Sequence, residues 1–144
     1  FAKSAGMGWA IHMSSLGFDE GSIVQEFGYD DDVAEEVRSA IERSTGEELV
    51  DEDYDDIADG AIAWWRSEDG NADDLADLFL DMKANLESES AICWLLVPGP
   101  REPGHVSASV IEEAAETAGL MATTNVAASE KWTGIRLTAT GARR

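Results

Sequence analysis

Residues 22–32 read Ser-Ile-Val-Gln-Glu-Phe-Gly-Tyr-Asp-Asp-Asp, and this stretch decides the fold. A β-rich run ends at Gly28, and apolar residues then recur at helical spacing from Val33 to Ile41. A strand, a glycine turn and a helix open α/β domains that bind nucleotides or cofactors, where a glycine-rich loop lets the backbone approach a phosphate. In this chain the loop has one glycine followed by Tyr29 and three carboxylates, and carboxylates repel anions. The stretch therefore predicts the fold without predicting its usual ligand.

Strands and helices alternate along the rest of the chain, which indicates an α/β sheet with helices on both faces and a C-terminal antiparallel hairpin. The strands are expected over residues 22–27, 47–50 (a short edge strand), 57–65 and 91–97, with the hairpin over 120–126 and 132–139. The helices are expected between Asp32 as N-cap and Gly46, from Asn71 as N-cap to Leu86, and from Ser107 or Ser109 to Gly119.

The length of 144 residues fits one domain with a substantial core. Residues 1–12 are interpreted as a remnant of an expression vector, because His12-Met13-Ser14-Ser15 reads like a cloning-site junction with the native start at Met13. We therefore expect a single α/β domain over residues 13–144.

The charge of the chain is strongly negative and unevenly distributed. The formal net charge is −20, and 25 of the 30 acidic residues lie between Asp19 and Glu89. Such a field disfavours nucleic acid and anionic membrane surfaces as partners and favours a basic protein surface. Solvation in a crowded cytoplasm is the alternative explanation of the same charge. A mimic of the charge of nucleic acid is a third explanation. We expect the protein in the cytoplasm.

The sequence offers little support for catalysis or metal binding. Cys93, the one cysteine, lies in an apolar strand and is expected to be a buried, inert thiol. Trp64, Trp65 and Trp94 have apolar neighbours and are expected in the core. The acidic run over residues 51–56 fails the calcium-loop pattern, which needs glycine at its sixth position and glutamate at its twelfth. We predict no catalytic residue, no metal site and no cofactor, and no apolar run approaches the length of a membrane span.

The carboxyl ends of the predicted strands are the place where a ligand site is expected, because function collects there in parallel α/β sheets. Glu26 and Arg66 fall at such ends. Asp51 follows Gly28 by 23 residues, near the position of a ribose-binding acid in a dinucleotide fold. The candidate ligand-binding residues are Gly28, Tyr29, Asp51, Asp69 and His105.

Seven stretches of the sequence carry a resemblance to a known family: residues 16–18, 24–30, 48–56, 94–96, 104–106, 118–120 and 132–137. Through them the chain resembles a small actinobacterial family classed as a domain of unknown function, DUF3052. The resemblance covers nearly everything from Leu16 onward. The resemblance implies an actinobacterial origin and a cytoplasmic location, and it implies no particular activity.

A broader resemblance is to the Rossmann-like methyltransferase fold. The stretch from Ile57 to Leu137 is similar to the second half of that fold, whereas the first half looks shortened by a strand and a helix. The resemblance implies a shortened, methyltransferase-like sheet with an S-adenosylmethionine site. The loop at Gly28 departs from the family pattern, because Tyr29 is bulky and the following acids repel the carboxylate of that cofactor.

Three hypotheses about function follow. The first is a non-enzymatic, cytoplasmic protein-binding or regulatory domain whose acidic face meets a basic partner. The alternative is a small-molecule binding protein or enzyme, with an adenosyl or nucleotide ligand at the strand ends. The third is a homo-oligomer that uses Trp132 or the hairpin edge as its interface. The acidic face of the first hypothesis consists of Asp30, Asp31, Asp32, Asp53, Asp55 and Asp56.

Overall fold

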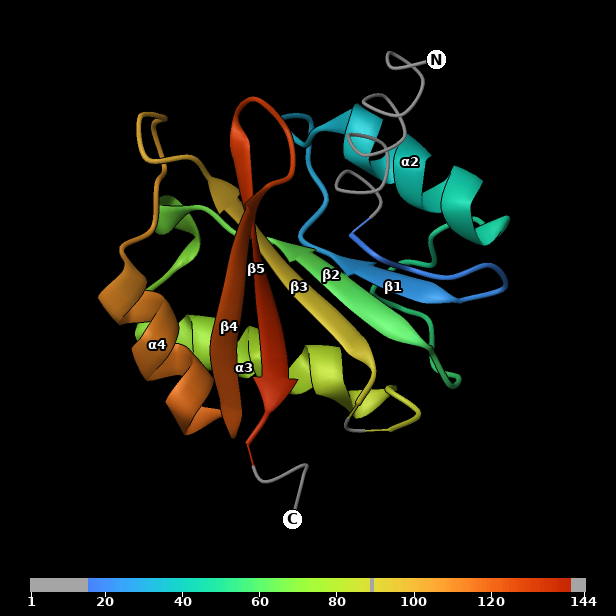
Figure 1. Cartoon of the computed structure of the whole chain (residues 1–144). Helices are drawn as coiled ribbons and strands as arrows, with labels where there is room; N and C mark the ends of the chain where they lie inside the picture. The colour runs from blue at the N-terminus through green and yellow to red at the C-terminus, as the bar shows by residue number, and fades with distance from the viewer. Residues whose placement is uncertain (1–15, 89, 141–144) are drawn as a thin grey trace.

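The computed structural model describes residues 16–88 and 90–140, so the interpretation of residues 1–12 as a vector remnant lies outside the described residues. Within the described ranges the chain forms one five-stranded sheet, three α-helices and one 3₁₀ turn (Figure 1). In chain order these are β1 (Val24–Phe27), α2 (Glu35–Thr45), β2 (Gly60–Trp64), η1 (Ser67–Asp69), α3 (Ala72–Ala84), β3 (Ile92–Pro98), α4 (Ala108–Thr117), β4 (Leu120–Ala127) and β5 (Trp132–Ala139).

The sheet has the strand order β1-β2-β3-β5-β4. The first three strands are parallel, with Val24 opposite Gly60 and Gly60 opposite Ile92. β5 runs antiparallel to β3, and β4 runs antiparallel to β5. The predicted fold class is therefore confirmed, including the C-terminal hairpin.

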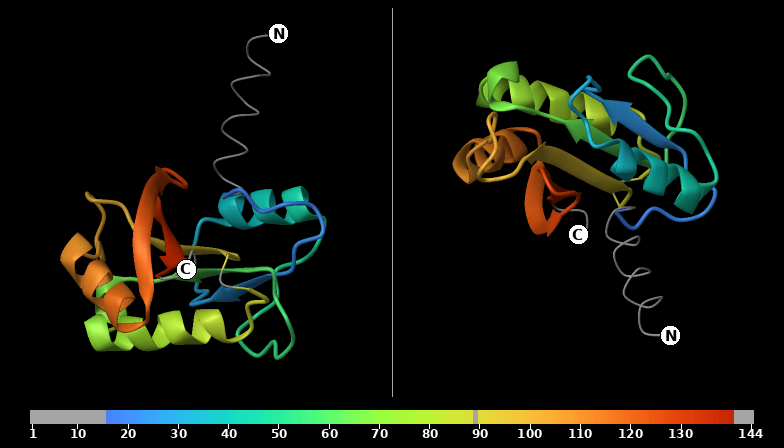
Figure 2. Two further views of the ribbon diagram at one scale, coloured as in Figure 1. Left: turned by 60° about the horizontal axis from the view of Figure 1, so that its bottom comes forward. Right: turned by 90° about the horizontal axis from the view of Figure 1, so that it is seen from above.

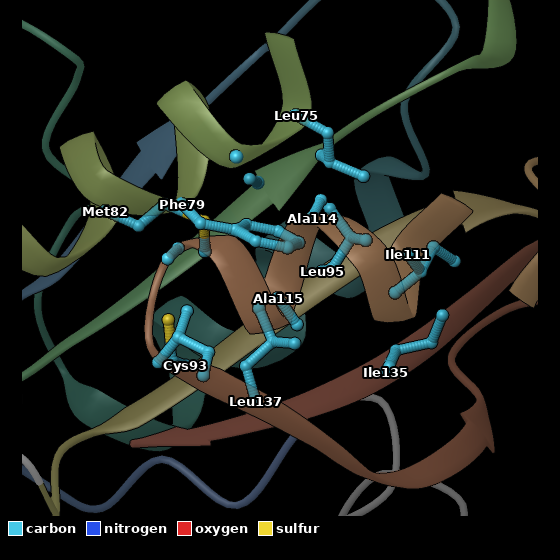
Figure 3. Packing of buried hydrophobic residues seen from close by; sticks show 14 of the residues in the cluster. Leu75, Phe79, Met82, Cys93, Leu95, Ile111, Ala114, Ala115, Ile135 and Leu137 are labelled. Carbon is cyan, nitrogen blue, oxygen red and sulfur yellow. The ribbon is translucent and has the colours of Figure 1, made fainter. Parts of the chain in front are cut away.

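Helices cover both faces of this sheet, α2 on one side and α3 with α4 on the other (Figure 2). The strands β2 and β3 are covered on both faces, which explains their almost continuous apolar sequences. Figure 3 shows the larger core cluster, in which Phe79 of α3 and Ala114 of α4 pack over Leu95 of β3. The cluster on the other face contains Trp64 and Trp94.

Several local predictions are confirmed by the hydrogen bonds at helix ends. The side chain of Asn71 caps α3 by accepting from the N–H of Asp74, and Ser107 caps α4 by accepting from the N–H of Val110. Gly46 ends α2 in the left-handed conformation, at φ 78°. Of the two serines considered for the start of α4, Ser107 is thus the cap.

Two local predictions are wrong. Asp32 does not cap α2, because the N-cap is Ala34 and no side chain there accepts a capping hydrogen bond. The expected edge strand over residues 47–50 reduces to a single bridge between Val50 and Gln25. The carboxylate of Asp32 is instead bound by an arginine, described below, and this contact outweighs a cap.

Cys93 and the tryptophans lie where the apolar pattern places them. Trp64 and Trp94 are buried and Trp65 is half-buried against the core. Burial of the Cys93 thiol raises its pKa to about 12, so the thiol stays protonated at neutral pH. None of the helices in residues 16–88 and 90–140 has the length and apolar character needed to cross a bilayer.

Candidate functional site

The switch point of the sheet lies between the carboxyl ends of β1 and β2. The chain leaves β1 toward α2 on one face and leaves β2 toward α3 on the other (Figure 2). In open α/β sheets this divergence creates the crevice in which ligands bind. The groups that fill the crevice here decide what it can hold.

Gly28 ends β1 in direct contact with β2. Its φ of +74° lies in the left-handed region that favours glycine, and a Cβ built on it would lie 2.3 Å from the carbonyl oxygen of Trp64. Its N–H donates a hydrogen bond of 2.7 Å to the Glu52 carboxylate. The glycine therefore serves the close packing of two strands, and the N–H that could face an anionic ligand is occupied by the protein's own acid.

Arg66 fills the crevice beside Gly28. Its side chain is about nine-tenths buried, and its Nη1 donates to the carbonyl oxygens of Gly28 (2.9 Å) and Trp64 (3.2 Å). Both oxygens of the Asp32 carboxylate accept from the same guanidinium, with Nε at 3.0 Å from Oδ2. The guanidinium thus ties together the loop after β1 and the end of β2, and it neutralises one of the loop's three acids.

An aromatic pair forms the side of the crevice next to Arg66. The guanidinium lies 5.3 Å from the centre of the Trp132 ring, and Trp132 packs edge-on against Trp64 at 4.9 Å between ring centres. The indole N–H of Trp132 donates to the carbonyl oxygen of Asp32. Trp132 is buried in this arrangement and leaves little of its surface for contact with a second copy.

The pairing with Arg66 gives the protein a specific dependence on pH. The hydrogen bonds from Arg66 hold the pKa of Asp32 below its ordinary value of 3.8. A carboxyl group with a lowered folded-state pKa stabilises the fold above its unfolded-state pKa, and this stabilisation is lost as pH falls through the lowered value. We expect Asp32→Asn to be less stable than the wild type at neutral pH and to converge with it below pH 3.8 in urea denaturation. A constant difference between the two proteins across the acid range would contradict the assignment.

A second charge pair lies at the end of β1, next to Trp64. The Glu26 carboxylate is buried at the end of the strand and accepts from Arg38 at 2.8 and 3.0 Å. The indole N–H of Trp64 donates to the same carboxylate at 2.8 Å. Arg38 also pairs with Glu35 at 3.0 Å, and the hydrogen bonds to Glu26 and Glu35, together with their charges, raise the pKa of Arg38 above its ordinary value.

A shallow hollow of about 350 Å³ opens beside this pair. Tyr29 forms one wall, with its ring 4.6 Å from the guanidinium of Arg38 and 52% of its surface exposed. The charge of Glu35, which also accepts a hydrogen bond from the Tyr29 hydroxyl, raises the tyrosine pKa. The hollow is lined by Glu26, Tyr29, Arg38, Asp51, Glu52 and Asp53.

The acidic connector over residues 51–56 is held in place by the side-chain amides of Gln25 and Asn85. The Gln25 side chain is almost completely buried and donates to the carbonyl oxygens of Asp51 and Tyr54, both at 3.1 Å. Asn85, at the end of α3, donates to the same Tyr54 carbonyl at 2.7 Å. The carboxylates of the connector therefore project from a fixed backbone, while all of Asp51, Glu52, Asp53, Asp55 and Asp56 remain exposed.

The predicted ligand residues do not form one site. Tyr29 and Asp51 line the hollow, whereas Gly28 is packed against β2. Asp69 accepts from the backbone N–H of Arg66 at 2.9 Å. The ring Nδ1 of His105 lies 2.8 Å from the carbonyl oxygen of Pro98, and His105 does not line the hollow. Within the described residues, no three histidine, cysteine or acidic side chains are arranged to hold a metal ion.

Sequence reasoning missed two of the residues that organise the site. Arg38 lies on the amphipathic helix α2, and Gln25 lies at an inward position of β1. A glutamine inside an apolar strand is a signal that was available, because a buried amide requires hydrogen-bond partners.

A family model described as "Protein of unknown function (DUF3052)" matches residues 13–141 of the chain. An uncharacterized protein of Mycobacterium tuberculosis H37Rv is 41% identical over 122 residues, which are 85% of this chain and 74% of the relative. An uncharacterized protein of Mycobacterium bovis matches with the same identity and coverage. The resemblance noted in the sequence is thus confirmed.

Solved structures with a similar fold are methyltransferases or related biosynthetic proteins. The pyocyanin biosynthetic protein PhzM superposes with a TM-score of 0.66 at 9% identity over 91% of this chain, which spans about half of that protein (54%). A magnesium protoporphyrin IX methyltransferase from Synechocystis, solved with bound SAM, gives 0.53 at 10% identity over 95% of this chain and 77% of its own. A ribosomal protein L11 methylase from Lactobacillus delbrueckii gives 0.52 at 14% identity over 92% and 77%. At these identities the likeness is one of fold alone.

Proposed function

The chain belongs to the DUF3052 family of proteins of unknown function, and we propose that it is a non-enzymatic domain that binds a basic protein surface. In this proposal the methyltransferase-like fold is a scaffold, and the binding face is built from the acidic loop after β1 and the acidic connector over residues 51–56. The one observation that carries the proposal is the filled switch point, where Arg66 and Glu52 take the positions open to a ligand.

The filled crevice argues against a nucleotide or adenosyl ligand on steric and electrostatic grounds. A ligand would have to displace the guanidinium of Arg66 from two backbone carbonyls and a carboxylate. Leaving such buried groups without partners costs about 1–3 kcal/mol for each group. The N–H of Gly28 would also have to exchange the Glu52 carboxylate for the ligand.

The backbone of the connector in the proposed binding face is held by hydrogen bonds, and the face mixes charge with exposed apolar surface. The hollow brings Tyr29 beside Asp51 and Asp53, so that the two acidic segments lie side by side. Tyr29 and Ile57 are among the large apolar side chains that remain exposed, and aromatic side chains inside a charged surface are typical of interface anchors. Asp32 has a structural role in the pair with Arg66, so Asp30, Asp31, Asp53, Asp55 and Asp56 carry the free charge.

Charge reversal tests the proposal with a matched control. We expect Asp53→Lys/Asp55→Lys/Asp56→Lys to reduce capture of a basic partner from actinobacterial cytoplasm and to slow its association by about tenfold or more at low salt. The control, Asp73→Lys/Asp77→Lys/Asp81→Lys on the exposed side of α3, makes the same change in net charge and should leave capture intact. The amount of captured partner is measured by quantitative mass spectrometry. Equal losses of capture in the two variants would mean that capture depends on net charge alone, and would overturn the proposal.

The competing small-molecule hypothesis is tested by thermal stability. A ligand that binds only the folded state increases the free energy of unfolding, by about 2.7 kcal/mol at a hundredfold excess over its dissociation constant. The midpoint of thermal unfolding rises as a result. We expect S-adenosylmethionine, its demethylated product and common nucleotides to leave the midpoint unchanged, because Arg66 occupies the crevice. A saturable rise with any of them would favour a ligand-binding protein over the proposed protein-binding domain.

A further inference from the structure

The outer edge of β4 is the sheet edge that no described segment covers. At the opposite edge, Val50 exchanges backbone hydrogen bonds with β1, through the N–H of Glu26 (2.8 Å) and the carbonyl oxygen of Val24 (3.0 Å). β4 pairs with β5 on one side and has no second neighbouring strand among residues 16–88 and 90–140. Alternate residues of such a strand direct their N–H and C=O groups outward, where an extended chain can pair with them.

The sequence of β4 lacks the charges and prolines that usually prevent pairing at a sheet edge. Its eight residues read Leu-Met-Ala-Thr-Thr-Asn-Val-Ala. A register shift between Ala122 and Thr124 bends the strand locally. A flexible peptide can follow such a bend more easily than the edge of a second rigid sheet can.

Helix α4 lies beside β4 (Figure 1), and a groove lies between the two elements beside this edge. It consists of two hollows of about 420 and 540 Å³ that share Ala122 of β4 and Glu112 of α4. Ile111 and Ile135 contribute apolar surface to the first hollow. Ala115, Leu120 and the half-exposed Met121 do so in the second. A strand added beside β4 would place alternate side chains over these two hollows.

The charge of the groove indicates the chemistry of its occupant. Glu112 and Glu116, both exposed on α4, are the charged residues that line the two hollows, and no basic side chain lines either one. Pairing β4 with the β4 of a second copy would bring two sets of these glutamates together, in chains that each carry a net charge of −20. A basic peptide makes the opposite, favourable contact.

We propose that the groove between β4 and α4 binds an extended peptide segment of a basic protein by addition of a strand to β4. Backbone hydrogen bonds to the edge hold the peptide, two apolar side chains two residues apart enter the hollows, and flanking lysine or arginine side chains contact Glu112 and Glu116. This surface lies at the opposite edge of the sheet from the acidic face, so the inference goes beyond the proposed function.

The probe is the peptide Lys-Thr-Val-Thr-Val-Thr-Lys, which places both valines and both lysines on one face of a strand. Titrated into the ¹⁵N-labelled protein, it should shift amide signals of β4 and α4 and leave those of β1 and α2 unchanged. A copy N-methylated at all of its threonines and valines cannot donate from these residues to the edge in either orientation, and a copy with terminal glutamates is repelled. We expect each to bind at least about tenfold more weakly.

Protein variants separate the parts of the proposal. Ala122→Phe fills the boundary between the hollows and should abolish binding of the peptide. Glu112→Lys should weaken binding of the peptide with terminal lysines and strengthen binding of the peptide with terminal glutamates. The N-methylated control needs no variant, so a poorly folded mutant does not decide the result. Equal binding of the N-methylated peptide, shifts outside β4 and α4, or no shifts at millimolar peptide would overturn the inference. A concentration-dependent dimer that Ala122→Phe abolishes would also overturn it, in favour of a second copy as the occupant.

Discussion

Gly28→Ala is expected to destabilise the fold by about 3 kcal/mol or more, one of the two largest effects we predict for a single substitution. The left-handed conformation at Gly28 costs an alanine about 1–2 kcal/mol. The added Cβ would lie 2.3 Å from the Trp64 carbonyl oxygen, and a backbone oxygen cannot rotate away as a side chain can. Forcing β1 and β2 apart adds about 1–3 kcal/mol of overpacking strain.

Gly46→Ala is the matched control for this substitution. Gly46 has nearly the same φ, +78°, but a Cβ on it would meet nothing within 4 Å. We expect it to cost only the conformational penalty, about 1–2 kcal/mol. Chemical denaturation of both variants gives the difference directly. Equal losses of stability would mean that glycine is required at position 28 for its φ alone. The close approach of the two strands would then contribute nothing to the cost of the substitution.

The contrast between these two glycines illustrates what the sequence can predict. Gly46 follows an amphipathic helix, so its role as a C-cap follows from local pattern. Gly28 also follows from pattern as the end of a strand. Its contact with Trp64 joins residues 36 positions apart, and its reason for being glycine depends on that contact. The apolar alternation that predicted the strands gives no information about which carbonyl faces which loop.

The fold was predictable because hydrophobic periodicity and end signals are local. The predictions for Asn71 and Ser107 needed only a polar residue before an apolar helical pattern. The prediction for Asp32 followed the same rule and is wrong, because Arg66 competes for the carboxylate from 34 residues away. A charged hydrogen bond to a buried guanidinium outweighs a cap, and only the tertiary structure brings Arg66 to that place.

The candidate site was predictable in location and not in organisation. Strand ends could be identified, so Glu26, Tyr29, Asp51 and Arg66 were predicted near the carboxyl ends of the strands. In the structure Glu26, Tyr29 and Asp51 line one hollow, and Arg66 contacts Gly28. The sequence could not show that the arginines divide them into two separate clusters. Arg38 binds Glu26, whereas Arg66 binds Asp32, and each pairing depends on the path of α2 relative to β2.

Glu26→Gln is the second substitution with a large expected effect, about 3 kcal/mol of lost stability. The carboxylate is 6% exposed and is held by two hydrogen bonds from Arg38 and one from the Trp64 indole. Breaking a buried ion pair by neutralising one partner typically costs about 3–5 kcal/mol, because the remaining charge is left without compensation. Arg38 is partly exposed, so solvent screens some of this loss and the lower end of the range is expected.

Glu35→Gln separates the effect of burial from the loss of charge. Glu35 contacts the same guanidinium at 3.0 Å, but its side chain is 60% exposed, and exposed ion pairs contribute at most about 1 kcal/mol. In urea denaturation at low and at high salt, we expect a small, salt-sensitive loss for Glu35→Gln and a large loss for Glu26→Gln that salt scarcely changes. Similar losses for the two variants would mean that the Glu26 pair behaves as a surface pair. The end of β1 would then be accessible to water.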